Sequence, residues 1–114
     1  VWAGLAGAAG VGLSAVAAHK VDSSALATAA TILTIHAVAA VAIYSLALRS
    51  ARSGLWSAVG LLMLFSATLF SGEIAFHTFT DIASLQFLAP IGGSGMILSW
   101  LLVAVAGFVS RGRN

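Results

Sequence analysis

Charged residues are scarce in this chain of 114 residues, which has five Lys or Arg and three Asp or Glu. They make up 7% of the chain, whereas soluble domains carry about 25%. This scarcity excludes an ordinary soluble domain. Cysteine is absent, which excludes disulfides and thiolate chemistry. The few basic residues form no continuous patch, so the net charge of +2 predicts no nucleic-acid partner.

What the chain does have is long hydrophobic runs, with 61% of its residues hydrophobic. Its charges leave four uncharged runs, at 1–18, 23–48, 53–72 and 82–110. Each run is close to the roughly 17–25 residues that cross a bilayer as a helix. A charge at mid-bilayer costs several kcal/mol, which explains why the runs lack them. We therefore predict one all-α domain over residues 1–114, an integral membrane four-helix transmembrane bundle with antiparallel neighbours and short loops. Its helices should cover about 1–18, 23–48, 55–80 and 90–110.

Two features place the helix starts. Ser23 or Ser24 can cap the second helix. Pro90, the one proline of the chain, should occupy the first position of the fourth helix, where its missing N–H is harmless.

The basic residues also predict an orientation. Arg49, Arg52, Arg111 and Arg113 fall on one side of the bundle, and Lys20, Asp22, Glu73 and Asp81 fall on the other. Because loops rich in Lys and Arg face the cytoplasm, we expect both termini there. The expected location is the bacterial inner (cytoplasmic) membrane.

Glu73, His77 and Asp81, here called the polar stripe, are spaced i, i+4, i+8 and share one face of a helix. His19 should lie near the same end of the bundle. Two imidazoles and carboxylates could bind a divalent metal. The alternative is that the stripe satisfies the water interface, with His77 paired to Glu73 or Asp81. The spacing is diagnostic of no metal, so no metal and no cofactor is assigned.

His36 lies inside an uncharged run with no local partner, and Trp100 lies about ten residues into its helix. The indole N–H of Trp100 needs an internal acceptor. We interpret His36 as a structural hydrogen-bonding group, with Trp100 as its expected partner. An ionisable group inside a membrane also suggests function. The alternatives are a proton relay or ligation of a haem or chlorophyll.

Small residues recur at i, i+4 spacing in the first run, around Gly7, Gly10 and Gly12. Such pairs let helix backbones approach closely. They could pack within the bundle or against another subunit. Gly92, Gly93 and Gly95 follow Pro90. They could pack the fourth helix against the first, or cradle an anion such as a lipid phosphate.

Three segments resemble a known family, the YgdD-like small membrane proteins of unknown function, which have distant relatives in animal mitochondria. The segments are Ser14–His19, His36–Ala40, and Leu69–Gly72 followed by Pro90–Gly93 and Trp100. They resemble the family's GAFGAH, HALAL and LFSGS…TPIGG…GW segments. The resemblance implies a four-helix fold and supplies no activity.

The chain shows no Ser/His/Asp spacing, HExxH, P-loop or dinucleotide fingerprint. We therefore expect no enzyme, but a non-catalytic integral membrane protein, an accessory or scaffold subunit of a larger membrane complex. Expected partners are membrane lipids and either other membrane subunits or further copies of the chain. The alternative is a small binding or transport protein for a metal ion, a proton or a lipid, using His36 or the polar stripe.

Overall fold

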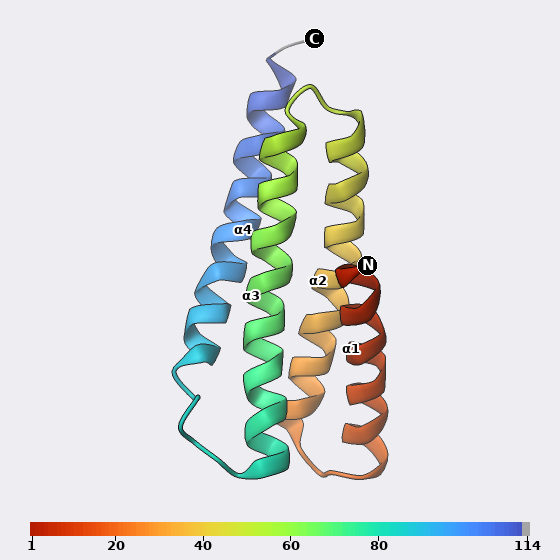
Figure 1. Cartoon of the computed structure of the whole chain (residues 1–114), viewed down its shortest axis with the longest axis vertical. Coiled ribbons are helices and arrows are strands. Elements are labelled where there is room, and N and C mark those ends of the chain that lie inside the picture. The colour runs from red at the N-terminus through yellow and green to blue at the C-terminus, as the bar shows by residue number, and fades with distance from the viewer. Residues whose placement is uncertain (113–114) are drawn as a thin grey trace.

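The structure is a computed structural model that describes residues 1–112, and within that range every regular element is an α-helix. The helices are Trp2–His19 (α1), Ser24–Arg49 (α2), Ser53–Thr80 (α3) and Leu88–Arg111 (α4). Each is long and apolar enough to cross a membrane. Consecutive helices run antiparallel and are joined by short connections (Figure 1). The predicted four-helix membrane bundle is confirmed.

The helix ends follow their local sequence with small shifts. Ser23 caps α2, because its hydroxyl accepts a hydrogen bond from the Leu26 N–H at 3.2 Å. The structure corrects the predicted start of α4, since the helix begins at Leu88 and Pro90 is its third residue. Proline is still harmless there, because the first four N–H groups of a helix have no intrahelical partner. Asp81 ends α3 in the left-handed region, with φ 57°.

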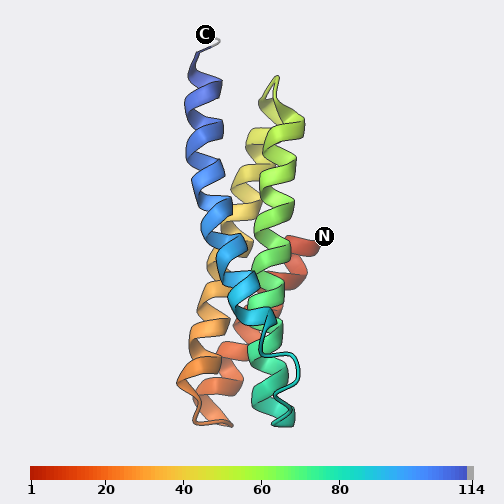
Figure 2. The ribbon, with the colours of Figure 1, turned by 90° about the vertical axis from the view of Figure 1, so that its left-hand side faces the viewer.

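The helices form an open array around α3. Helix α3 packs along both α2 and α4, α1 packs along α2, and α1 touches α3 at a few residues. Figure 1 and Figure 2 show α4 on one side of α3 and α1 at the opposite edge of the array. No backbone contact joins α1 to α4 within residues 1–112. The prediction that the fourth helix packs against the first is therefore wrong.

Two hydrophobic clusters fill the interior. One joins all four helices in the half of the bundle that contains α1, and its buried members are Ala6, Leu33, Ala37, Ala40, Leu64, Ala67 and Met96. The other lies nearer the α2–α3 connection and contains Ile43, Ala47, Trp56, Val59, Met63 and Ala106. Alanines are frequent in both clusters, and small side chains let helices approach closely in a membrane, where lipid offers no hydrophobic drive between them.

The charged residues gather at opposite ends of the array. Arg49 and Arg52 flank the α2–α3 connection, and Arg111 ends α4 beside it (Figure 1). Lys20 and Asp22 lie in the α1–α2 connection at the other end. Arg113, which the sequence places with the other arginines, lies outside the described residues.

Candidate functional site

A hydrogen bond between His36 of α2 and Trp100 of α4 links two helices whose backbones do not contact each other within residues 1–112. The Trp100 Nε1–H donates to His36 Nε2 at 3.1 Å, and the two ring centroids lie 6.0 Å apart in an edge-on arrangement. His36 is buried, whereas Trp100 is 45% exposed. The partner predicted for Trp100 is present. One side of its indole faces outward.

Both ring nitrogens of His36 have partners. Because Nε2 accepts from Trp100, Nδ1 carries the proton and donates to the Ile32 carbonyl at 2.7 Å. These partners assign the tautomer. Neither nitrogen is free to ligate a haem or chlorophyll or to take up a relayed proton unless one of the two bonds breaks. The geometry describes His36 as a structural link between α2 and α4.

Glu73 lies within the fold, seven residues before the end of α3, and is 6% exposed. Within residues 1–112 its carboxyl makes no hydrogen bond and no ion pair, and the carboxyl oxygens are not fully enclosed. That Glu73 satisfies the water interface stays a prediction, although most of its side chain is covered by the fold. A carboxylate without a partner is costly in apolar surroundings.

Glu73 lines a shallow groove of about 400 Å³ on the outer face of α3, here called the Glu73 groove. Trp2 of α1 contributes to its lining, as do Leu85 and Leu88. The connector 81–87 turns back toward the other end of the bundle before α4 begins (Figure 1). The remaining lining residues are Phe65, Thr68, Leu69, Gly72 and Phe76.

The polar stripe does not assemble into a site. The His77 Nδ1–H donates to the Ile82 carbonyl at 3.2 Å, and His77 Nε2 accepts from the Gln86 amide at 3.4 Å. The predicted pairing of His77 with Glu73 or Asp81 is therefore wrong. Asp81 caps α3, and His19 is exposed at the end of α1. No group of three His, Asp or Glu suited to a metal occurs in the range 1–112.

The glycines of α1 divide between two faces. Gly10 lies against α2, where an added Cβ would approach the Ala30 carbonyl at 3.1 Å and collide with the Thr34 hydroxyl. Gly7 faces Ala37 of α2 at ordinary contact distance. Gly12 points outward, with nothing within 4 Å of its Cβ position. The small residues thus serve α1–α2 packing on one face and remain open on the other.

The glycines of α4 pack against α3. A Cβ on Gly92 would lie 2.7 Å from the Phe70 nitrogen and from the Ser66 carbonyl oxygen. Gly95 faces the Ser66 side chain in the same way, and Gly93 lies 3.9 Å from the Phe70 ring. Atoms of α3 fill the space in front of Gly92 and Gly95. The structure therefore favours a role of these glycines in helix packing over a role in binding an anion.

At the arginine end, a pocket of about 370 Å³ includes Arg49, Arg52, Trp56 and Ser110 in its lining. The Arg52 Nε–H and the Ser110 hydroxyl are both buried there and have no hydrogen-bond partner among residues 1–112. Ser50 fixes the turn by accepting from the Arg52 N–H at 3.0 Å. This pocket concentrates positive charge beside the α2–α3 connection.

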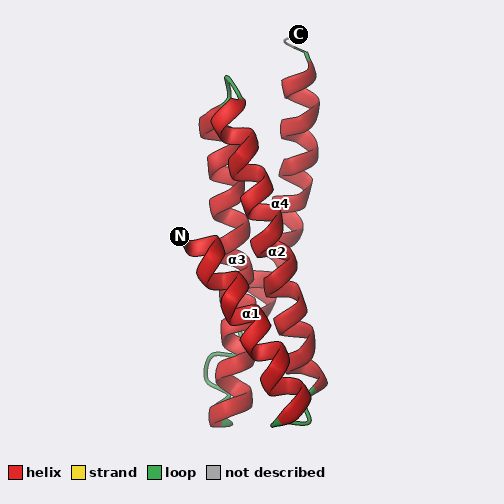
Figure 3. Ribbon diagram, turned by 90° about the vertical axis from the view of Figure 1, so that its right-hand side faces the viewer, coloured by secondary structure: helices red, strands yellow, loops and turns green. Residues whose placement is uncertain are grey.

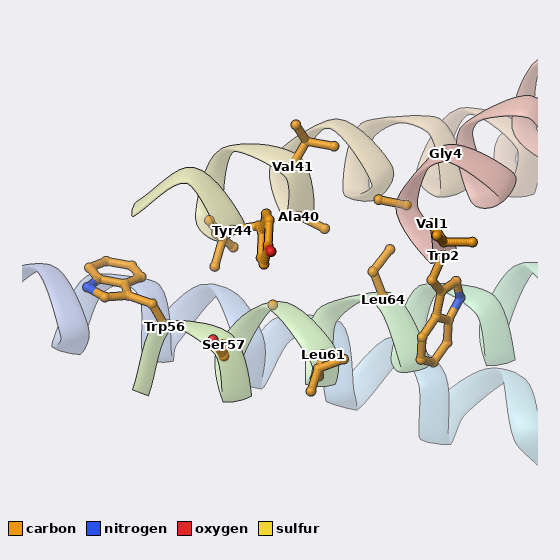
Figure 4. A pocket seen from close by; sticks show the side chains of 13 residues that line it. Val1, Trp2, Gly4, Ala40, Val41, Tyr44, Trp56, Ser57, Leu61 and Leu64 are labelled. Carbon is orange, nitrogen blue, oxygen red and sulfur yellow. The ribbon is translucent and has the colours of Figure 1, made fainter. Parts of the chain in front are cut away.

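A second groove, of about 420 Å³, lies between α2 and α3 next to the first residues of the chain. In Figure 4, Val1 and Trp2 lie at one end of this groove and Trp56 at the other. Tyr44 and Ser57 also line it, and most of the remaining lining is aliphatic. Nothing in its chemistry selects a particular ligand.

Two cross-helix hydrogen bonds were not apparent from the sequence. The Trp2 Nε1–H donates to Thr68 at 3.1 Å, and the Ser71 hydroxyl donates to the Ala29 carbonyl at 2.9 Å. Ser71 is fully buried. A serine in an apolar helix usually bonds to its own backbone, so its residue type alone does not reveal a contact between helices.

Comparison with known proteins gives a family without an activity. The family described as "Protein of unknown function (DUF423)" matches residues 12–93. The UPF0382 membrane protein YwdK of Bacillus subtilis is 33% identical over 71 residues, which cover 62% of this chain and 58% of the relative. No solved structure matches the chain. These matches agree with the resemblance to small membrane proteins of unknown function.

Proposed function

Because the chain belongs to the DUF423 family of proteins of unknown function, we propose that it acts without catalysis, as an accessory or scaffold subunit that associates with another membrane-spanning helix. The partner is a second copy of the chain or a different membrane protein. Within this proposal we assign the chain to the YgdD-like small membrane proteins, which its three sequence segments resemble.

The outward face of α1 carries the proposal. Gly4, Ala8 and Gly12 are exposed and spaced i, i+4, i+8, and neither glycine has a neighbour within 4 Å of its Cβ position. Figure 3 shows α1 at the edge of the array, with no other helix between it and the viewer. In a membrane, a ridge of small residues lets the backbone of a second helix approach closely. A second helix therefore makes closer van der Waals contact with this ridge than a lipid chain does.

Site-specific cross-linking tests this association. The chain lacks cysteine, so Gly4→Cys introduces a single thiol on the proposed interface. We expect oxidation of membranes that contain this variant to give a cross-linked dimer, or an adduct with another subunit. Adding Ala8→Leu should reduce the cross-linked fraction several-fold, because a bulky side chain separates the backbones.

Ala104→Leu is the matched control, since Ala104 is an exposed alanine on α4. This substitution should leave the cross-linked fraction unchanged. Equal cross-linking in the Ala8→Leu and Ala104→Leu backgrounds would show that the α1 face contacts lipid, and would remove the basis of the proposal.

The proposed location is the bacterial inner membrane, with the arginine end in the cytoplasm. The support is the grouping of Arg49, Arg52 and Arg111 at one end of the array, which the positive-inside rule assigns to the cytoplasmic side. Under this orientation the Glu73 groove lies nearer the opposite membrane surface.

A further inference from the structure

We propose that the Glu73 groove binds a lipophilic organic cation, meaning an ammonium-type group on an apolar body, with the Glu73 carboxylate as its counter-ion. This function is separate from the helix association proposed for α1. The groove lies on the outer face of α3, while the proposed partner contacts the outer face of α1.

The first argument is the missing counter-charge. Glu73 is 6% exposed, and it has no hydrogen-bond or ion-pair partner in residues 1–112. Its carboxyl oxygens are not fully enclosed, and the residue lines the groove. No Lys or Arg of the described part of the chain lines the groove. An ionised carboxylate away from water requires a compensating charge or hydrogen bonds. A cationic ligand supplies both.

The second argument is the lining. Trp2, Phe65 and Phe76 line the same groove as Glu73, and the indole of Trp2 is held by its hydrogen bond to Thr68. Aromatic faces attract organic cations, and cages of such rings are used to recognise quaternary ammonium groups. The leucines of the lining offer contact to the apolar body of the ligand.

The ligand set argues against a metal ion. Glu73 and the Thr68 hydroxyl are the polar side chains of the groove. Hard divalent cations take about six oxygen ligands, and Zn²⁺ takes about four. A diffuse organic charge needs no coordination shell, so one carboxylate and aromatic rings suffice.

The size and access of the groove suit a molecule that partitions into lipid. Its volume of about 400 Å³ lies within the range of roughly 300–1,000 Å³ typical of small-molecule sites. Gly72 is exposed on the outer face of α3, and nothing lies within 4 Å of its Cβ position. A ligand can therefore enter sideways from the surrounding lipid.

Binding of dodecyltrimethylammonium to the purified full chain in an uncharged maltoside detergent tests the proposal. Glu73→Gln removes the charge with little change in shape, and should weaken binding by about tenfold or more. Asp81→Asn makes the same chemical change at an exposed carboxylate near the same end. It should change the affinity by less than about twofold, because exposed charges are screened by solvent. Neutral dodecanol should bind the wild type no better than it binds Glu73→Gln.

A second variant keeps the test decisive if Glu73→Gln fails to fold. Gly72→Leu leaves the carboxyl in place and fills the floor of the groove, and its side chain meets no atom of the fold near its Cβ. It should abolish dodecyltrimethylammonium binding. Unchanged affinity in Gly72→Leu, or equal losses in Glu73→Gln and Asp81→Asn, would overturn the proposal.

Native mass spectrometry distinguishes two natural sources of the cation. Phosphatidylethanolamine bound to the wild type, absent from Glu73→Gln and displaced by dodecyltrimethylammonium would identify a lipid headgroup. A wild type that binds the probe without retaining this lipid would indicate a free amphipathic amine. If Glu73→Gln instead releases a protein subunit and leaves probe affinity unchanged, Glu73 pairs with that subunit and the proposal fails.

Discussion

Several hydroxyl side chains in these helices donate a hydrogen bond to the backbone of their own helix. The Thr34, Thr78 and Ser99 hydroxyls each donate to the carbonyl four residues earlier, at 2.9, 2.7 and 2.7 Å. This pattern is how Ser and Thr are accommodated inside apolar helices. His36 and Trp100 differ, because the Trp100 indole finds its acceptor on another helix. Polar groups of this second kind fix how the helices sit against one another.

We predict that Trp100→Phe destabilises the bundle through His36. The substitution leaves the Nε2 acceptor of a buried imidazole without its donor, at a cost of about 1–3 kcal/mol. Thermal unfolding in detergent should therefore show a lower Tm than for the wild type. In a His36→Leu background the same substitution should cost clearly less, because no acceptor remains. Equal losses in the two backgrounds would indicate that Trp100 contributes by packing and not by its hydrogen bond.

At the scale of the helices, close approach holds the array together. Helix α1 reaches α2 at Gly10, and α4 reaches α3 at Gly92, and at both positions a Cβ would meet the backbone of the neighbouring helix. Lipid supplies no hydrophobic drive between helices, so these van der Waals contacts carry much of the packing energy. The two helix pairs should therefore be sensitive to single methyl groups at these glycines.

We predict opposite outcomes for two substitutions on α1. Gly10→Leu would force the side chain into Ala30 and Thr34 of α2, and overpacking of this kind costs about 1–3 kcal/mol. Gly4→Leu meets no neighbouring atom and should leave Tm unchanged in monomeric detergent preparations. Similar Tm values for both variants would show that α1 does not pack on α2 through Gly10.

The helices could be predicted from the sequence because the bilayer excludes charge, and each uncharged run corresponds to one helix. The helix ends were harder to predict from the sequence. Pro90 is the third residue of α4 and not the first, because the first turn of a helix tolerates proline at several positions. The burial of Glu73 could not be predicted. Glu73 lines a groove together with Trp2 of α1 and with Leu85 and Leu88, and contacts between segments so far apart in the chain do not follow from local pattern.

At the scale of the whole molecule, charge separates the two ends of a body whose principal extents are 51, 25 and 19 Å. The arginines of the α2–α3 connection and of the α4 terminus share one end, and Lys20 and two Asp residues lie at the other. Basic groups close to helix ends determine how a helix pair enters the membrane. The distribution predicts one orientation for the whole bundle.

We predict that a reporter fused after Asn114 is active in its cytoplasmic form and inactive in its periplasmic form. The physical reason is the cost of translocating the arginine end across the membrane. The reverse pattern should appear for a reporter inserted in the α1–α2 connection. Periplasmic activity at Asn114 would contradict the assigned orientation.

The open array also bears on how the protein is made. Each helix after α1 packs on the helix that precedes it in the chain, so a ribosome-bound chain can bury its helices in the order of synthesis. Two hydrogen bonds depart from that order, since Trp2 and Thr68 are 66 residues apart and His36 and Trp100 are 64 apart. The Trp2 indole and the His36 imidazole therefore enter the bilayer before their partners exist. Until those partners are translated, they depend on water, lipid headgroups or the insertion machinery for hydrogen bonds.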